Sequence, residues 1–230
     1  MDLSRRSFLT AMAGASAVGV AALGSSAAVA APRPDGKVVT PAEALDRLQR
    51  GNTRYVHGNQ RQVTYAPPGQ APEAGQWPFA AILSCSDSRV VPENIFDVAP
   101  KNLFIVRNAG NLVDDVTMGS LEYAAVHTGI SLILVLGHSN CGAVDATQAS
   151  LATGETPEPF IDSIVEAISP AVEPLPAGHT LNDAVAANAR YQARRIQNLS
   201  PTLAAKTAAG TLGIVKGVYG LSDRRVTFLP

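Results

Sequence analysis

The chain has 230 residues, of which 46% are hydrophobic and 16% are charged, and its formal net charge at pH 7 is -1. The first thirty residues contain one acid and two arginines, so the net charge without them is -2. A charge this close to neutral gives no reason to expect a nucleic-acid partner or binding to an anionic membrane surface. The roughly 200 residues that follow are enough for one domain with a sizeable core.

The N-terminus has the pattern of an export signal. Arg5 and Arg6 stand in a Ser-Arg-Arg-Ser-Phe-Leu segment, and an uncharged stretch of small and aliphatic residues follows. Residues 1–30 are therefore predicted to be a twin-arginine signal peptide that is cut after an Ala-Val-Ala sequence ending at Ala30, with residues 31–38 as a linker. The predicted location is periplasmic, cell-wall-associated or secreted. An uncleaved membrane anchor is the alternative, because the apolar stretch approaches the roughly 20 residues that span a bilayer.

Helices and strands alternate along residues 39–230, which we interpret as a single domain. A helix is predicted to begin at Pro41 and end near Tyr55, because Thr40 is a favourable N-cap and Pro41 occupies the first helical position. Short uncharged aliphatic runs, which are typical of strands buried on both faces of a sheet, predict strands at Phe79–Leu83 and Leu132–Leu136. Further strands are predicted at Leu103–Arg107, Leu212–Tyr219 and Val226–Leu229, and further helices from Asp114 to about His127, from Cys141 to about Leu151 and from Leu181 to Leu199. This order predicts an α/β fold with a largely parallel central sheet flanked by helices.

Both cysteines of the chain and one histidine follow two of these aliphatic runs. Cys85 comes after the first run, and His138 and Cys141 come after the second with a His-x-x-Cys spacing. Functional ligands gather at the carboxyl ends of parallel strands. Two thiolates and one imidazole suit zinc and leave a fourth position for water or a further side chain. In an exported protein a disulfide between the two cysteines is the alternative, although a disulfide would not require the nearby histidine.

Five segments together form a specific family pattern. They are Gly51-Asn52-x-Arg54-Tyr55-Val56-x-Gly58, Cys85-Ser86-Asp87-Ser88-Arg89, Val106-Arg107-Asn108-Ala109-Gly110-Asn111, Leu121-Glu122-Tyr123-Ala124 and Gly137-His138-Ser139-Asn140-Cys141-Gly142-Ala143. With these segments the chain resembles the β-class carbonic anhydrases over nearly all of residues 39–230. The resemblance implies one Zn²⁺ per chain on Cys85, His138 and Cys141. It also implies an obligate dimer or a dimer of dimers, in which the N-terminal helix packs across the partner and the sheets meet edge to edge.

The resemblance assigns roles to residues around the zinc. It makes Asp87 and Arg89 the catalytic pair, and Asp87 a fourth zinc ligand in an inactive state. Gln76 would donate a hydrogen bond to the substrate across the dimer interface, and Tyr123 would wall an apolar substrate pocket. For Gln76 an ordinary surface position is the alternative, and for Tyr123 an ordinary core position.

Some members of this family are inhibited by bicarbonate held at a second site that contains a tryptophan, an arginine and a tyrosine. Arg107 and Tyr219 match the arginine and the tyrosine, but Ile82 stands where the tryptophan would be. The partial match predicts that strong bicarbonate inhibition is absent. A packing role for Tyr219 is the alternative to a role in bicarbonate binding.

The predicted function is the reversible hydration of carbon dioxide to bicarbonate and a proton by zinc-bound hydroxide. Zinc lowers the pKa of a bound water from near 16 toward about 7, but two thiolates cancel its formal charge and should make the water less acidic than a three-imidazole site does. Asp87 can accept the hydrogen bond of the hydroxide while Arg89 holds the carboxylate ionised and off the metal. A solvated surface ion pair is the alternative for these two residues. Two other functions stay open, namely hydrolysis of carbonyl sulfide or carbon disulfide on the same scaffold, and a non-catalytic exported binding protein stapled by a metal or a disulfide.

Overall fold

The computed structural model describes residues 37–61, 75–155 and 158–230. The predicted signal peptide and all but the last two residues of the predicted linker lie outside these ranges. Within them, no helix combines the length and the apolar character needed to cross a bilayer.

A five-stranded sheet forms the centre of the described chain, with strand order β2-β1-β3-β4-β5. The strands are β1 (Ala80–Cys85), β2 (Leu103–Asn108), β3 (Leu132–His138), β4 (Gly213–Tyr219) and β5 (Val226–Phe228). Strands β1 to β4 run parallel to one another, and β5 runs antiparallel to β4. The predicted α/β fold with a largely parallel sheet is therefore confirmed.

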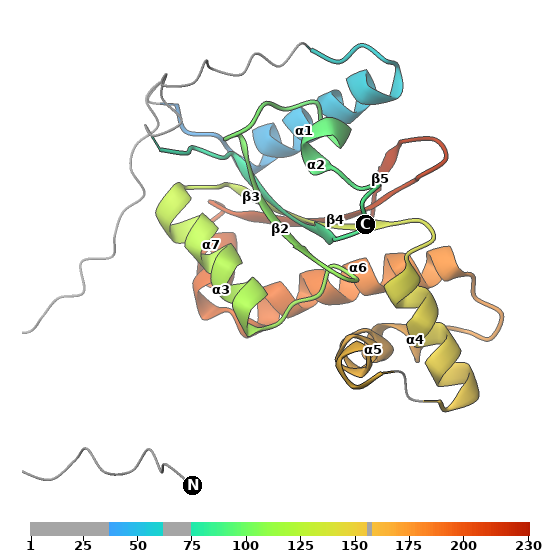
Figure 1. Ribbon diagram of the computed structural model, residues 1–230. Helices are drawn as coiled ribbons and strands as arrows, with labels where there is room; N and C mark the ends of the chain where they lie inside the picture. The colour runs from blue at the N-terminus through green and yellow to red at the C-terminus, as the bar shows by residue number, and fades with distance from the viewer. Residues whose placement is uncertain (1–36, 62–74, 156–157) are drawn as a thin grey trace, which may run out of the picture.

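Helices cover both faces of this sheet (Figure 1). They are α1 (Pro41–Val56), α2 (Pro92–Ile95), α3 (Asp115–Tyr123) with a π-helical turn η1 (Ala124–Thr128), α4 (Gly142–Thr153), α5 (Pro159–Val172), α6 (Leu181–Leu199) and α7 (Pro201–Ala208). One face carries α1 and α2, and the other carries α3, α6 and α7, while α4 and α5 form a lobe beside α6. As predicted, the side chain of Thr40 caps α1 by accepting a hydrogen bond from the amide of Glu43.

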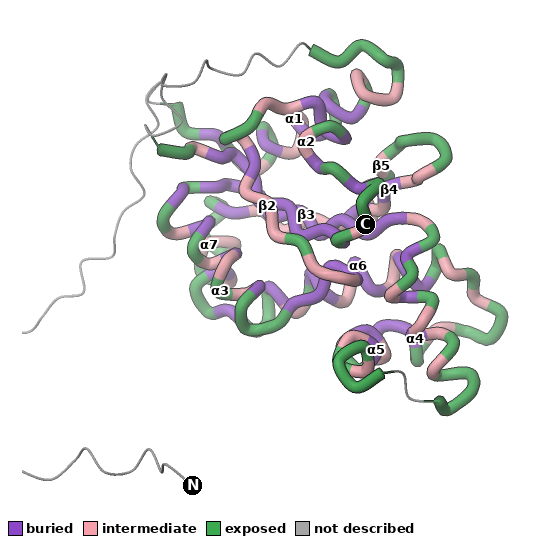
Figure 2. Tube along the Cα trace, in the orientation of Figure 1, coloured by how far each residue is buried: buried purple, intermediate pink, exposed green. Residues whose placement is uncertain are grey.

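The two central strands are buried along their whole length. Every residue of β1 and of β3 is buried, as Figure 2 shows in purple for β3. Side chains of the two strands alternate between the hydrophobic cluster under α1 and α2 and the cluster under α3, α6 and α7. The parallel register pairs Ala80 with Leu132 and Ser84 with Leu136, so both strands end at the same edge of the sheet.

Three helices were not predicted from the sequence, and two of them are long enough to matter for the core. Helix α5 lies inside a proline-rich span. Helix α6 ends at Leu199 and α7 begins at Pro201, so the single residue Ser200 separates the two helices. Pro159 and Pro201 occupy the first positions of these helices, where the missing amide hydrogen costs nothing because that amide has no partner within the helix. Both prolines are therefore helix starts. The third helix, α2, is a single short turn.

Candidate metal centre and active site

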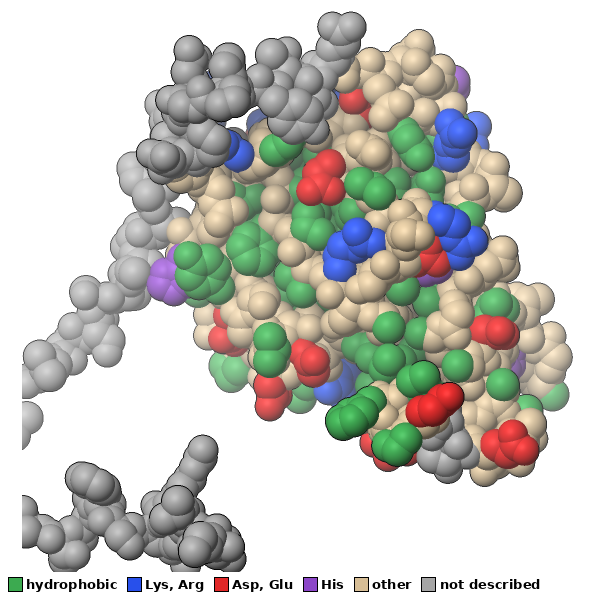
Figure 3. All heavy atoms as spheres, viewed as in Figure 1, with side chains coloured by type: hydrophobic (Ala, Val, Ile, Leu, Met, Phe, Trp, Pro, Cys, Tyr) green, Lys and Arg blue, Asp and Glu red, His purple; other side chains and the backbone are tan. Residues whose placement is uncertain are grey.

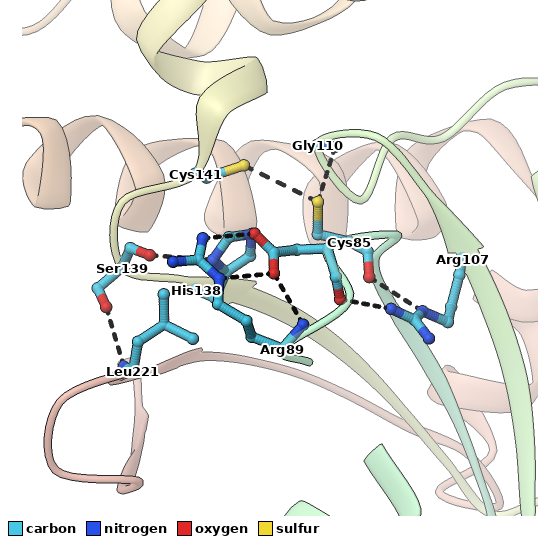
Figure 4. Close-up of polar contacts among 9 residues, drawn as sticks. Cys85, Arg89, Arg107, Gly110, His138, Ser139, Cys141 and Leu221 are labelled. Carbon is cyan, nitrogen blue, oxygen red and sulfur yellow. Dashed lines mark hydrogen bonds and ion pairs between the residues drawn. The ribbon is translucent and has the colours of Figure 1, made fainter. Parts of the chain in front are cut away.

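The ends of β1 and β3 bring three metal-ligating side chains together. Cys85 is the last residue of β1, His138 is the last residue of β3, and Cys141 is the N-cap of α4. All three are buried, and their ligand atoms lie within 4.8 Å of one another. Figure 4 shows the two sulfur atoms and the imidazole converging from these three elements. The grouping follows from the topology, because neighbouring parallel strands present their carboxyl ends at one edge.

The geometry of the three residues fits a tetrahedral metal ion. The two Sγ atoms are 4.0 Å apart, whereas two thiolates at about 2.3 Å from a tetrahedral zinc would be about 3.8 Å apart. Both cysteines are free thiols. His138 bonds through Nδ1 to the carbonyl oxygen of Ser139 at 2.9 Å, and its buried Nε2 has no hydrogen-bond partner. A backbone acceptor on Nδ1 orients the ring so that Nε2 can bind a metal.

The protonation of the three residues also favours a cation. The hydrogen bond between the two sulfurs, in which either atom can be the donor, lowers the pKa of Cys85 and raises that of Cys141. Burial alone would lower the pKa of His138, but the negative charge of the neighbouring Cys85 thiolate and the bond to the carbonyl oxygen of Ser139 outweigh burial and raise it. The two sulfurs thus share one proton. A divalent cation can replace this proton and bring both thiols to the ionised form.

Asp87 and Arg89 form an ion pair directly beside the three ligands. Arg89 donates from Nε to Oδ1 of Asp87 at 2.9 Å and from Nη2 to Oδ2 at 2.6 Å, and its backbone amide donates to Oδ1 at 2.9 Å. These bonds, led by those from the guanidinium, hold the pKa of Asp87 well below its ordinary value. Oδ2 of Asp87 lies 3.9 Å from Nε2 of His138. The carboxylate is therefore ionised, restrained, and close to the nitrogen that would bind a metal.

The two residues predicted for a second bicarbonate site bond to different partners. Arg107 donates from Nε to the carbonyl oxygen of Cys85 at 3.0 Å and from Nη2 to that of Asp87 at 2.7 Å. Figure 4 shows this guanidinium turned toward the backbone of the loop after β1. Tyr219 is buried, and its hydroxyl lies 3.3 Å from that of Tyr55 on α1. In this structure Arg107 holds the loop that contains Asp87, and Tyr219 joins the sheet to α1.

Gln76 and Tyr123, the two predicted pocket residues, lie away from the three ligands of the same chain. Gln76 is exposed and precedes the amino end of β1, while Cys85 ends that strand, and six residues of strand alone span about 17 Å. The ring of Tyr123 lies 6.2 Å from the ring of Phe104, and Phe104 pairs with Ala81 near the start of β1. A single chain therefore does not bring either residue to the cluster.

Comparisons with known proteins point to one family. The family model described as carbonic anhydrase matches residues 80–226. The carbonic anhydrase of Mycolicibacterium smegmatis is 36% identical over 81% of this chain and 92% of its own length. A β-carbonic anhydrase of Coccomyxa has a solved structure that is 28% identical, covers 82% of each chain and superposes with a TM-score of 0.61.

The chain belongs to the β-class carbonic anhydrase family. Carbonic anhydrase 2 of Mycobacterium tuberculosis is a further relative, 35% identical over 80% of this chain and 91% of its own length. The structure of a β-carbonic anhydrase named CcaA is 26% identical, with a TM-score of 0.59 over 68% of this chain and 78% of the other. Carbonic anhydrases are lyases, so the chain belongs to a family of enzymes whose fold it shares.

Beyond the residues predicted from the sequence, the structure of this β-class family member adds a backbone contact to the site. The amide of Gly110 donates to Sγ of Cys85 at 3.4 Å (Figure 4). Gly110 belongs to the Val106–Asn111 segment of the family pattern, but no feature of the sequence predicts its bond to the thiol. A backbone amide is present at every position except proline, and the sequence has no signal for which amide reaches a sulfur.

Proposed function

We propose that the protein catalyses the reversible hydration of carbon dioxide to bicarbonate and a proton, with one Zn²⁺ bound by Cys85, His138 and Cys141. The observation that supports this most directly is the position of Asp87. Its carboxylate is held by Arg89 at 3.9 Å from the unpartnered Nε2 of His138. Two thiols and an imidazole could serve a purely structural metal. A restrained, ionised carboxylate beside them adds a group that can orient a nucleophile, which a structural metal does not need.

When bound, zinc would supply a Lewis acid that lowers the pKa of a water molecule toward neutrality. The chain supplies the orientation. Asp87 stays ionised and is therefore a hydrogen-bond acceptor only, so it can fix the direction of the nucleophile's proton. Arg89 binds the carboxylate bidentately and so restrains it from binding the metal itself. Arg107 fixes the backbone on which Asp87 stands.

Metal content and carbon dioxide hydration test this proposal together. The protein purified without its first thirty residues is expected to contain about one zinc per chain, to have two titratable thiols once the zinc is removed, and to hydrate carbon dioxide in a stopped-flow assay with a pH indicator. The rate is expected to rise with pH above neutrality, because two thiolates reduce the charge that the zinc presents to water. A metal-bound protein with no hydration activity would instead support carbonyl sulfide or carbon disulfide hydrolysis, or a stapled binding protein, and the two hydrolyses can be assayed on the same sample.

We also propose that the active unit is a homodimer that completes each site with residues of the partner. Strand β2 is the edge of the described sheet, with β1 on one side and no strand on the other. Its central residues Phe104, Ile105 and Val106 are only half buried, and hydrophobic side chains gather on the face that looks onto β2 in Figure 3. Gln76 and Tyr123 are exposed and lie far from the cluster of their own chain, which is the position expected of residues that serve the partner's site.

Mixed dimers test the contribution of Gln76 across the interface. Gln76→Ala has an intact metal site, and Cys85→Ser has an intact Gln76, so each variant alone should be much less active than the native protein. If Gln76 acts across the interface, a mixed dimer has one site with both features intact, and dissociating and reassociating the two variants together restores activity to about a quarter of the native value per site. If Gln76 acts within its own chain or not at all, the mixture shows only the average of the two variants.

We further propose that residues 1–30 direct export by the twin-arginine route and that residues 39–230 are the exported domain. The paired arginines and the Ala-Val-Ala sequence support this proposal. Replacing Arg5 and Arg6 by lysine should leave full-length protein in the cytoplasm, whereas the native sequence should yield an exported form that begins at Ala31. N-terminal sequencing of the exported form separates a cleaved signal from a retained anchor.

A further inference from the structure

The bond from the amide of Gly110 to Sγ of Cys85 is enclosed in the protein. Cys85 is 6% exposed and Gly110 is buried. An N–H donor at 3.4 Å from a thiolate withdraws electron density from the sulfur, and outer hydrogen bonds of this kind tune a metal centre. What fixes the position of Gly110 therefore affects how strongly Cys85 can donate to a metal.

Gly110 is held in a conformation that few other residues adopt. Its φ is +76°, and a Cβ atom at this position would lie 2.9 Å from Cδ1 of Ile168 and 3.3 Å from Cβ of Ala143. Its carbonyl oxygen accepts a hydrogen bond from Nδ2 of Asn188 on α6 at 2.9 Å. The backbone of Gly110 therefore makes two hydrogen bonds, one from its amide to Cys85 and one from Asn188 to its carbonyl oxygen.

Asn188 is itself oriented by a second buried amide one turn further along α6. Gln192 donates from Nε2 to Oδ1 of Asn188 at 3.1 Å and to the carbonyl oxygen of Ala167 on α5 at 3.3 Å. Oε1 of Gln192 accepts from the amide of Val113 at 3.0 Å, three residues after Gly110. Asn188 is 1% exposed and Gln192 is 0% exposed. Buried amides with their hydrogen-bonding groups satisfied are costly to reorient, so this pair holds the segment from Gly110 to Val113 at two points.

We infer that Asn188 and Gln192 are positioning residues for the metal centre, which act through Gly110 on the thiolate of Cys85. This inference rests on the proposed zinc site. Asn188 aims the backbone, and Gln192 fixes the rotamer of Asn188 and ties the same loop to α5 and α6.

The test uses Co²⁺ in place of zinc, because thiolate-bound cobalt has a near-ultraviolet charge-transfer absorption that reports the electron density of the sulfurs. Asn188→Leu removes the bond to Gly110 while keeping a similar volume. The matched control is Asn52→Leu, because Asn52 is also a buried amide that bonds to backbone groups of three residues, namely Ile95, Arg224 and Val226. Two of these partners, Ile95 and Val226, belong to the hydrophobic cluster under α1 and α2, on the other side of the sheet from α6.

In Asn188→Leu the charge-transfer band is expected to move to longer wavelength, because the sulfur becomes richer in electrons. The zinc affinity, measured by competition with a chelator, is expected to fall about 10- to 100-fold, because Cys85 is no longer held in place by the amide. Gln192→Met should cause a smaller shift in the same direction, because it acts on Gly110 only through Asn188 and the loop, and it provides the test if Asn188→Leu does not fold. Asn52→Leu should lower the thermal stability but leave the band and the affinity unchanged.

If the Asn188 and Asn52 variants have the same band and the same zinc affinity as the native protein, the inference is wrong while the proposed zinc site stands. If the native protein shows no thiolate-to-cobalt band at all, the proposed zinc site fails as well. The two failures are therefore distinguishable without an activity measurement.

Discussion

Replacing Asp87 by asparagine should abolish most of the hydration activity without disturbing the metal centre. The change removes one charge and keeps the shape of the side chain. In the native structure the carboxylate accepts three hydrogen bonds from Arg89, two at Oδ1 and one at Oδ2, so both of its oxygens act as acceptors. An asparagine offers one acceptor oxygen, and its NH₂ group would face either the guanidinium of Arg89 or the nucleophile. A positioned acid–base group typically contributes about 10²- to 10⁴-fold to a rate, which is about 3–5 kcal/mol of the activation barrier.

Stopped-flow measurement of kcat/KM over a range of pH, together with zinc analysis, tests this expectation. The native profile should show no loss of activity from protonation of Asp87 until the pH falls below the ordinary pKa of a carboxyl, because a lowered pKa keeps the group ionised down to that point. Asp114→Asn is the matched control, since that carboxylate caps α3 by accepting from the amide of Thr117 and asparagine caps helices equally well. If Asp87→Asn retains native kcat/KM with full zinc content, the assigned role of this carboxylate is refuted.

Three further predictions concern the metal and the packing of α1. Zinc affinity should rise about tenfold per pH unit for each proton that the metal displaces, because the raised pKa values of Cys141 and His138 keep these groups protonated at lower pH. A zinc affinity that is independent of pH in a chelator titration would contradict this. Cys141→Ser should reduce the zinc content well below one per chain, as measured by atomic absorption, while the far-ultraviolet circular dichroism still shows the native secondary structure, and full zinc retention would exclude this residue as a ligand. Gly51→Ala should lower the free energy of unfolding by about 1–3 kcal/mol, because its Cβ would clash with the backbone of Phe96. The control is Gly119→Ala, which has open space around it and should be neutral or stabilising by up to about 1 kcal/mol. Equal urea midpoints for the two variants would show that α1 is not packed as described.

Much of the fold was predictable because its signals are local. Helix α6 begins and ends at the predicted residues, Leu181 and Leu199, since the capping box formed by Thr180 and Asp183 lies within four residues of sequence. The aliphatic runs of β1 and β3 were recognisable for the same reason. Helix α5 was not predicted, because prolines favour both loops and the first turn of a helix, and only packing against α4 and α6 decides between them.

The site divides in the same way. The sequence by itself determined the donors, since a thiol and an imidazole keep their chemistry in any fold, and the position of Cys85, His138 and Cys141 after strand-like runs indicated that they would meet. Only the tertiary structure decided which groups surround them. The bond from Asn188 to Gly110 joins residues 78 positions apart, and in the sequence a polar residue on a helix looks like part of the solvent-exposed face. Such contacts depend on how helices and sheet pack, and that packing is set by the whole chain rather than by any one segment of it.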